Sequence, residues 1–361
     1  MDVTVVGSGN GGLATAFDFA MHGHAVRLFD TPHFPDHVAE VAEAGGIHAT
    51  GEIEGFAEIT YAGHDAHTAL STADLVVLVG PAYSTEHQAA VVAPHLTPGQ
   101  AVLVCPSSCA GAIAFKQVAG LALDDSRLTV GETSTLPYAV RITAPGRINI
   151  FHKLRSGVYV AGLPTTGTAR LLSMIQDVYP GTEAADNVLQ TTLQNGNPVI
   201  HPAVTLLNAG LIERTGGDFL FYEEGVTESV GRVIEAVDRE RLAIAAELGV
   251  RVLSEPDLGV LQGYMREANY STGYSTAPGF LGIGAQNQLA HRYLVEDVGY
   301  SLVFLSDLAS RLGIDTPTMD ALITLASTAL ERDFRGEGKR TLATLGLDET
   351  SLRQLASSTE S

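Results

Sequence analysis

The chain is short of cysteine and of basic residues, and each shortage argues against a class of protein. It has only two cysteines, Cys105 and Cys109. With no second pair to complete a zinc site and no secretory context, we expect two reduced structural thiols and no metal site. Lysine and arginine number 21 against 41 acidic residues, which gives a formal net charge of -20. Nucleic acid and anionic membranes attract basic surfaces, so we expect neither as a partner.

Long hydrophobic runs are also missing. The longest apolar runs, such as residues 75–79, have the length of a β-strand and are far too short for a membrane span. The chain starts with a strand and no basic flank, so we expect no signal peptide and a cytoplasmic location. Its 361 residues, of which 45% are hydrophobic, suffice for two domains with separate cores.

A glycine-rich turn opens the chain. Residues 2–12 read DVTVVGSGNGG, which is a short β-branched strand followed by a G-x-G-x-x-G motif. In a dinucleotide-binding turn the first glycine permits the tight turn, the second lets the backbone approach a pyrophosphate, and the third lets the next helix pack closely. The predicted cofactor-binding residues are therefore Gly7, Ser8, Gly9, Asn10, Gly11 and Gly12.

The next predicted strand, residues 25–29, ends in Asp30. A carboxylate about 20 residues after the glycines can accept both ribose hydroxyls of NAD and would repel the 2′-phosphate of NADP. We therefore predict NAD as the cofactor, with NADP less favoured. The alternatives are a turn that binds nothing and a solvated carboxylate at a strand end.

Strand and helix alternate through the first half, which predicts a parallel sheet with right-handed crossovers. Apolar strands are expected at residues 74–79 and 101–104, and the loops after them start at Gly80-Pro81 and at Pro106. Ligands bind at these carboxyl ends in open α/β sheets, so Gly80 and Pro81 are predicted to contact the cofactor. Residues 139–161 are predicted to extend the same sheet in antiparallel fashion.

The pattern changes to a helical period near residue 186. The predicted fold is thus α/β, with a Rossmann-type doubly wound domain at residues 1–185 followed by an all-helical domain at 186–361. Expected helices are residues 188–214, interrupted at Asn197-Pro198 and His201-Pro202, then 227–248, 286–312 and 316–334.

One of the twelve histidines stands apart. His201 lies in an apolar helical stretch just after the change of domain, and a proton donor suited to neutral pH is needed beside a nicotinamide. A histidine on such a face is more often a hydrogen-bonded core residue. Arg292 and Asp297 are candidate partners, but on an α-helix they project about 140° apart, and a solvated ion-pair face explains them equally well.

Four stretches resemble the opine dehydrogenases, the octopine and nopaline dehydrogenase family. They are residues 7–12, residues 131–141, residues 195–208, and residues 292–297. The resemblance implies a nucleotide domain, a helical domain and an active site between them. It implies that His201 is the catalytic histidine, Asp297 its partner carboxylate and Arg292 the arginine that holds a substrate carboxylate. It also implies cleft positions at Glu132 and Thr133, and it suggests a homodimer.

The reaction implied by the resemblance joins an amino acid or amine to a 2-oxo acid and reduces the imine with NADH. Where some relatives carry a glutamine toward the oxo acid, this chain has Ser108. A serine reaches less far, so a pyruvate preference does not carry over. Glu132 can meet a cationic substrate group, or it can accept loop backbone N–H bonds.

Two other functions stay open from the sequence. A 2-oxo-acid reductase of the ketopantoate reductase type shares the nucleotide turn and a helical second domain, but it usually depends on a catalytic lysine, and Lys339 is the only lysine after residue 186. The other is a non-catalytic NAD-binding sensor.

Overall fold

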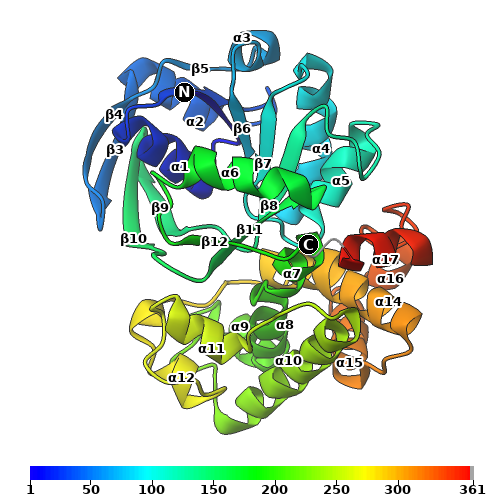
Figure 1. The fold of residues 1–361 in the computed structure, drawn as a ribbon. Coiled ribbons are helices and arrows are strands. Elements are labelled where there is room, and N and C mark those ends of the chain that lie inside the picture. Colours follow the sequence, from blue (N-terminus) through cyan, green and yellow to red (C-terminus); the bar gives the residue numbers. More distant parts are fainter. Residues whose placement is uncertain (358–361) are drawn as a thin grey trace. The chain divides into compact units, whose positions relative to one another are not determined.

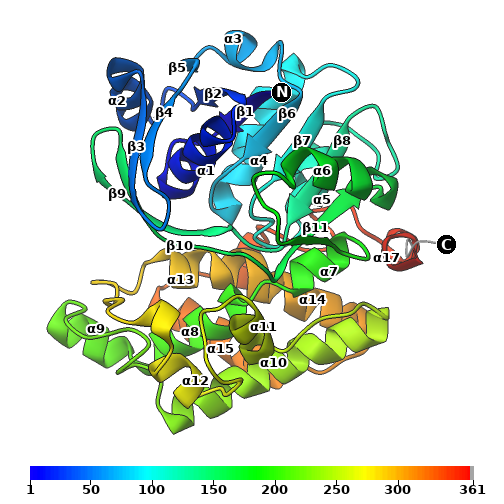
Figure 2. The same cartoon turned by 60° about the vertical axis from the view of Figure 1, so that its left-hand side comes forward.

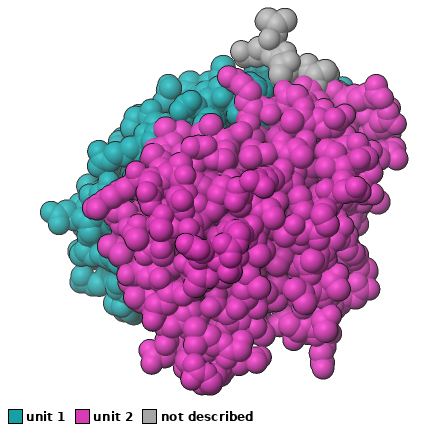
Figure 3. Space-filling model, turned by 90° about the horizontal axis from the view of Figure 1, so that it is seen from below, with its two compact units in different colours: residues 1–191, 358–361 teal, residues 192–357 magenta. Residues whose placement is uncertain are grey.

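The computed structural model describes residues 1–357. The chain divides into two compact units, Met1–Thr191 and Thr192–Ser357, which Figure 3 draws in two colours. The sequence predicts the boundary at residue 185. In the structure the boundary between the two units lies within α7 (Val188–Leu193). The start of α7 stays with the first unit because the Thr191 hydroxyl donates a 2.5 Å hydrogen bond to Glu132.

The first unit is built on an eight-stranded sheet (Figure 1). Its strands are β1 (Asp2–Val6), β2 (Ala25–Phe29), β5 (Tyr61–Gly63), β6 (Leu75–Leu78), β7 (Ala101–Val104), β8 (Thr129–Thr133), β11 (Val158–Leu163) and β12 (Thr182–Ala184). The order is β12-β11-β8-β7-β6-β1-β2-β5, and the six strands from β5 to β8 run parallel. All residues of β6 and β7 are buried, as expected of parallel strands covered on both faces. The predicted Rossmann-type sheet is confirmed.

Helices connect these strands. They are α1 (Asn10–Met21), α2 (Asp36–Ala44), α3 (Ala66–Leu70), α4 (Ala82–Val92), α5 (Gly111–Val118) and α6 (Thr168–Ile175). Because β1 leads directly into α1 and β6 into α4, the amino ends of these two helices follow the carboxyl ends of neighbouring strands. That is the edge of an open α/β sheet at which ligands bind.

A second, four-stranded sheet corrects the prediction for residues 139–161. It consists of β3 (Gly46–Gly51), β4 (Gly55–Glu58), β9 (Tyr138–Ala144) and β10 (Arg147–Lys153), in the order β4-β3-β10-β9. Of the stretch at residues 139–161, only the part that lies in β11 joins the main sheet, where β11 pairs antiparallel with β8.

Contacts with α1 explain why β9 leaves the main sheet. The Asn10 side-chain oxygen accepts a 2.7 Å hydrogen bond from the Ile142 amide. The Tyr138 hydroxyl donates at 2.7 Å to Asp18, which is fully buried in α1. Helix α1 therefore packs on strands of both sheets (Figure 2), and Leu13 and Phe17 belong to the common core.

The second unit is helical, as predicted. Its helices are α8 (Asn197–Leu207), α9 (Ala209–Thr215), α10 (Glu228–Leu248), α11 (Glu255–Leu261), α12 (Thr272–Ser275), α13 (Arg292–Val295), α14 (Val303–Leu312), α15 (Pro317–Ala329), α16 (Phe334–Glu337) and α17 (Glu349–Ser357). Up to residue 357, its β pairing consists of one isolated bridge between Leu220 and Gly284.

The prolines of α8 behave differently from each other. A break at Asn197-Pro198 is confirmed, because α8 begins at Asn197 with Pro198 in its first turn, where a missing N–H costs nothing. The predicted break at His201-Pro202 is wrong, because α8 continues to Leu207. Pro202 removes one helical hydrogen bond, and the burial of neighbours such as Val199 and Val204 offsets the loss.

The predicted helix at residues 286–312 is also interrupted. It begins only at Arg292, where the His291 ring accepts from the Tyr293 amide. A π-helical turn, Asp297–Leu302, then separates α13 from α14. Such wide turns are rare and often mark functional sites. Among the described residues, no helix has the length and apolar character needed to cross a membrane.

Candidate active site

Two glycines of the first turn are required by close packing. Gly7 has φ +109°, and a Cβ there would lie 2.1 Å from the Val79 carbonyl oxygen. A Cβ on Gly12 would lie 1.8 Å from the Gly7 oxygen, so α1 approaches the strand as closely as backbone allows. A Cβ on Gly9, in contrast, would meet nothing within 4 Å. The turn therefore leaves open space at Gly9.

The first turn of α1 offers backbone amides to a ligand. Gly9 is the N-cap and no side chain caps this turn, so the orphan N–H groups of a helix start face outward. The Asn10 side-chain oxygen accepts from the Ile142 amide and does not cap the helix. A pyrophosphate would complete this site through the amides of Asn10, Gly11 and Gly12.

Asp30 is fixed beside the turn. One carboxylate oxygen accepts from both the amide and the hydroxyl of Ser8, each at 2.7 Å, and the other accepts from the Thr31 amide at 2.8 Å. A carboxylate has about four acceptor sites, so capacity remains for ribose hydroxyls. Gly9, the bare amides and Asp30 together fit a dinucleotide.

The loops after β6 and β7 carry three further predicted residues. Pro81 is the N-cap of α4, and a Cβ on Gly80 would lie 2.2 Å from the Ser84 hydroxyl oxygen. Ser108 is buried and has φ +43°, as part of a run of left-handed residues. Such strained backbone costs free energy and clusters at functional sites.

Glu132 and Thr133 end β8 and are fully buried. One Glu132 oxygen accepts from the Ala112 amide at 2.7 Å and the other from the Thr191 hydroxyl at 2.5 Å. The Thr133 hydroxyl donates to the Thr135 carbonyl at 2.9 Å. The Ala112 amide is a backbone donor of the kind that the sequence offers as the alternative to a cationic substrate group.

His201 and Asp297 come together in the second unit. His201 lies on α8 and Asp297 starts the π-helical turn. The His201 Nδ1 lies 2.8 Å from an Asp297 carboxylate oxygen, and the two side chains are 8% and 2% exposed. A carboxylate on one ring nitrogen fixes the tautomer and the orientation of the imidazole. This is the arrangement of an acid–base pair.

Aromatic residues around His201 were missed by sequence reasoning. The Tyr293 ring stacks on the imidazole at 3.9 Å, and the Tyr222 hydroxyl lies 3.2 Å from Nε2. Tyr222 in turn stacks on Phe280 at 4.2 Å. The aromatic run Phe219-Leu-Phe-Tyr222 was the available signal, although nothing in it pointed to His201.

Arg292 has a different environment from Asp297. Its Nε lies 3.2 Å from a Glu296 carboxylate oxygen, and its side chain is 46% exposed while that of Glu296 is 2% exposed. The guanidinium therefore reaches the surface of the second unit and has a planar fork that matches a carboxylate. The separate directions expected of residues 292 and 297 on a helix agree with these two environments.

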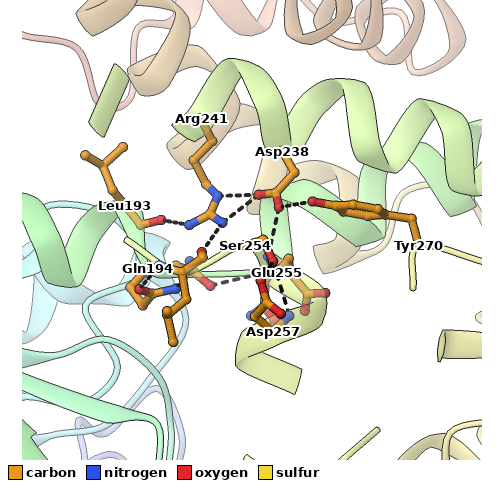
Figure 4. A network of polar contacts seen from close by, with 11 residues as sticks. Leu193, Gln194, Asp238, Arg241, Ser254, Glu255, Asp257 and Tyr270 are labelled. Atoms are coloured by element: carbon orange, nitrogen blue, oxygen red, sulfur yellow. Dashed lines mark hydrogen bonds and ion pairs between the residues drawn. The ribbon is translucent and has the colours of Figure 1, made fainter. Parts of the chain in front are cut away.

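A buried charge network holds the segment before α8 (Figure 4). Arg241 donates to Asp238, to the Leu193 carbonyl and, at 2.7 Å, to the Leu253 carbonyl. The other Asp238 oxygen accepts from the Glu255 amide and the Tyr270 hydroxyl. Glu255 packs against Gly196, the N-cap of α8, where a Cβ would lie 2.9 Å from its side chain. Burial and the neighbouring Asp238 raise the pKa of Glu255 well above its usual value.

The described residues contain no cluster of metal-ligating side chains, and both cysteines are buried. Across residues 1–357, no three His, Cys, Asp or Glu side chains are grouped so as to hold a metal ion. Cys105 and Cys109 are buried and form no disulfide. Burial raises the pKa of the Cys105 thiol to about 12, which leaves it protonated and unreactive at neutral pH.

Comparisons with known proteins agree with this geometry. Residues 184–330 match the family model described as NAD/NADP octopine/nopaline dehydrogenase, alpha-helical domain. The chain is 34% identical to the opine dehydrogenase of Arthrobacter sp. (strain 1C), over 99% of this chain and 98% of that protein.

Solved structures show the same fold. An octopine dehydrogenase in complex with NADH and agmatine is similar with a TM-score of 0.78 and 19% identity, over 92% of this chain and 90% of the other. A ketopantoate reductase from Ralstonia eutropha JMP134 gives a TM-score of 0.64 and 20% identity, over 94% and 100%. The fold is thus shared with reductases, whereas the full-length identity to an opine dehydrogenase is specific. The chain belongs to the opine dehydrogenase family.

Proposed function

We propose that this protein catalyses the NADH-dependent reductive condensation of an amino acid or amine with a 2-oxo acid, and its reverse. The product is an N-(1-carboxyalkyl) amino acid or the corresponding secondary amine. The observation that carries the proposal is the buried His201–Asp297 pair with 2.8 Å between nitrogen and oxygen, in a chain of the opine dehydrogenase family.

The turn at the start of the chain would hold NADH. The amides of α1 would bind its pyrophosphate beside Gly9, and Asp30 would accept from the ribose hydroxyls. A carboxylate disfavours a 2′-phosphate, so we infer a preference for NAD over NADP. The bound cofactor supplies the hydride that turns an imine into an amine.

His201 would move protons during imine formation. Asp297 holds the Nδ1 side of the ring, so Nε2 is the nitrogen that exchanges protons with the reacting groups. Protonated, it assists loss of water from the carbinolamine that precedes the imine, and neutral, it takes a proton back in the reverse direction. The low exposure of both side chains keeps water from competing for these protons.

Arg292 would bind a substrate carboxylate through its planar fork. Its half-exposed side chain supports this role, because a planar guanidinium at the surface can meet a carboxylate of a ligand. Ser108, Glu132 and Thr133 are all buried, so they would influence substrate binding from beneath the surface of the first unit. Of these, Glu132 would act through the position of α5 and α7, since both its oxygens bind those helices.

A matrix of amino acids against 2-oxo acids tests the proposal. NADH absorbance is followed with each pair and with each single substrate. The expected result is NADH oxidation only when both substrates are present. Oxidation with an oxo acid alone would indicate a reductase of the ketopantoate type. Binding of NADH with no turnover of any pair, unchanged by substitution of His201, would indicate a sensor.

We also infer a cytoplasmic enzyme that forms a homodimer. The reduced state of Cys105 and Cys109 supports a reducing compartment. Light scattering after size exclusion tests the dimer, which predicts about twice the chain mass of 37.9 kDa, and a monomer at micromolar concentration would contradict it.

A further inference from the structure

Both ring nitrogens of His201 already have protein partners. Nδ1 contacts Asp297 at 2.8 Å and Nε2 contacts the Tyr222 hydroxyl at 3.2 Å. If the proposed function holds, a substrate exchanges protons with Nε2 of His201, and the Tyr222 hydroxyl oxygen already lies at that nitrogen. We propose that Tyr222 is a third catalytic residue, which passes protons between His201 and the substrate.

A phenol hydroxyl can serve as such a relay because it donates one hydrogen bond and accepts others at the same time. When the imidazole is neutral, with its proton on Nδ1 facing Asp297, the Tyr222 hydroxyl donates to Nε2. When the imidazole is protonated, Nε2–H donates to the phenol oxygen. The phenol hydrogen is then released to donate to a substrate.

The relay balances in the step that forms the imine. The carbinolamine hydroxyl takes the phenol proton, its C–O bond breaks, and water leaves. The nitrogen lone pair forms the C=N bond, which gives an iminium ion. At the same time the phenol oxygen takes the Nε2 proton of His201. The phenol is restored, the imidazole becomes neutral, and one positive charge has moved from His201 to the substrate.

Packing fixes Tyr222 in the orientation that this relay needs. Its side chain is 5% exposed, it stacks on Phe280 with an interplanar angle of 14°, and it meets Phe221 edge to face at 87°. Tyr293 covers one face of the imidazole at 3.9 Å. Both rings are therefore held, and the phenol oxygen stays at Nε2.

The surroundings of Tyr222 favour a protonated phenol that relays protons over a tyrosinate that acts as a base. Burial raises the pKa of Tyr222 well above 10, and Tyr293, Glu255, Tyr264 and Asp297 raise it further. An isolated tyrosinate is thus too costly to form at working pH. The phenol can pass a proton only if it receives one in the same step, and His201 is the group in contact that supplies it.

The variant Tyr222→Phe tests the proposal, because it removes one oxygen and keeps the ring. We expect kcat to fall by about 100-fold or more, with NADH affinity unchanged. The dependence of kcat on the fraction of D2O should also show that fewer protons move in the rate-limiting step. Tyr274→Phe is the matched control: this ring is fully buried near Phe280, and its hydroxyl has no hydrogen-bond partner. Its kcat should equal that of the wild type.

Wild-type kcat and an unchanged pH profile in Tyr222→Phe would overturn the relay. Faster turnover would also overturn it, because it would mean that substrate displaces the hydroxyl to reach His201. If Tyr222→Phe does not fold, difluorotyrosine at position 222 keeps the oxygen and makes it more acidic. The relay then predicts a changed kcat, because a more acidic phenol gives up its proton more readily, and a kcat equal to that of the wild type would refute it. Failure of the proposed function appears differently, as a wild-type protein that turns over no pair of substrates.

Discussion

At the scale of single residues, the partner of each ring nitrogen decides what His201 can do. A buried histidine with carbonyl partners is part of a core, whereas one held by a carboxylate is oriented and basic. His201 has Asp297 on one nitrogen and a tyrosine hydroxyl on the other. His37 also pairs with a carboxylate, that of Glu40, but its side chain is 41% exposed, whereas that of His201 is 8% exposed.

Substitution of Asp297 by asparagine tests this difference. The amide keeps the shape but removes the charge that favours one tautomer and the protonated ring. We expect kcat to fall by about 100- to 10,000-fold, with NADH binding unchanged, in stopped-flow and fluorescence measurements. Asp320→Asn is the control, because Asp320 is a half-exposed carboxylate of the same unit. A near-normal kcat in Asp297→Asn would contradict the role.

The sequence predicted residues of this kind unevenly. The glycines and Asp30 were recognisable because their spacing encodes a backbone conformation, and Gly7 and Gly12 indeed have no room for a Cβ. His201 and Asp297 are 96 residues apart, so no local pattern could join them, and only the resemblance to a family did. Tyr222 was missed because its contact with His201 depends on how its segment folds back over α8.

At the scale of elements, two glycines of the turn before α1 have different roles: Gly7 is needed for packing, whereas Gly9 leaves space for a ligand. Gly7→Ala places a Cβ 2.1 Å from a carbonyl oxygen at positive φ, so we expect a loss of about 1–3 kcal/mol in the free energy of unfolding. Gly9→Ala meets no protein atom within 4 Å. It should keep its stability and weaken NADH binding roughly tenfold or more, because the methyl group enters the pyrophosphate space.

Chemical denaturation and NADH fluorescence measure the two effects side by side. Equal destabilisation of both variants would contradict the packing argument. Unchanged NADH affinity in Gly9→Ala would contradict the position of the pyrophosphate.

Helix α10 provides a second contrast, between a buried and an exposed ion pair. Asp238 and Arg241 are 0% and 1% exposed, whereas Arg239 and Glu235 are 73% and 34% exposed. Asp238→Ala leaves a buried guanidinium without its carboxylate and should lower the free energy of unfolding by about 3–5 kcal/mol. Arg239→Ala should change it by less than about 1 kcal/mol. Urea titrations of both variants check this, and similar losses would refute the distinction.

Helices and strands could be predicted where the residues of the segment itself determine its structure. Helix α10, which the sequence predicts at residues 227–248, has Thr227 as its N-cap and a left-handed Gly249 at its end, and these are residue types that commonly start and end helices. The four-stranded sheet, in which β10 pairs with both β3 and β9, was not predictable, because it depends on contacts that Asn10 and Tyr138 make with residues far away in the sequence. The π-helical turn at Asp297 was not visible either, since an α-helix and a π-helix share the same apolar pattern over so few residues.

At the scale of the whole molecule, the pH dependence of stability should include a contribution from one buried lysine. Lys116 donates to the carbonyls of Ala122, Leu123 and Asp125. Burial lowers its pKa from 10.5 to about 8. Between these values the unfolded chain binds more protons than the folded one, so this residue makes stability rise with pH over that interval.

The variant Lys116→Met isolates this contribution. It removes the titrating group, so the difference in free energy of unfolding between wild type and variant should change in favour of the wild type from pH 8 to 10.5. Urea titrations at several pH values measure it. Parallel stability curves for the two proteins would contradict the assignment.

The central claim is that the protein joins an amine to a 2-oxo acid, and the mass of the product tests it most directly. The wild-type enzyme is incubated with NADH, an amino acid and a 2-oxo acid, and the products are read by mass spectrometry. The account predicts a secondary amine whose mass equals both substrates minus water plus two hydrogens. A 2-hydroxy acid formed from the oxo acid alone, with the amino acid unchanged, would contradict it.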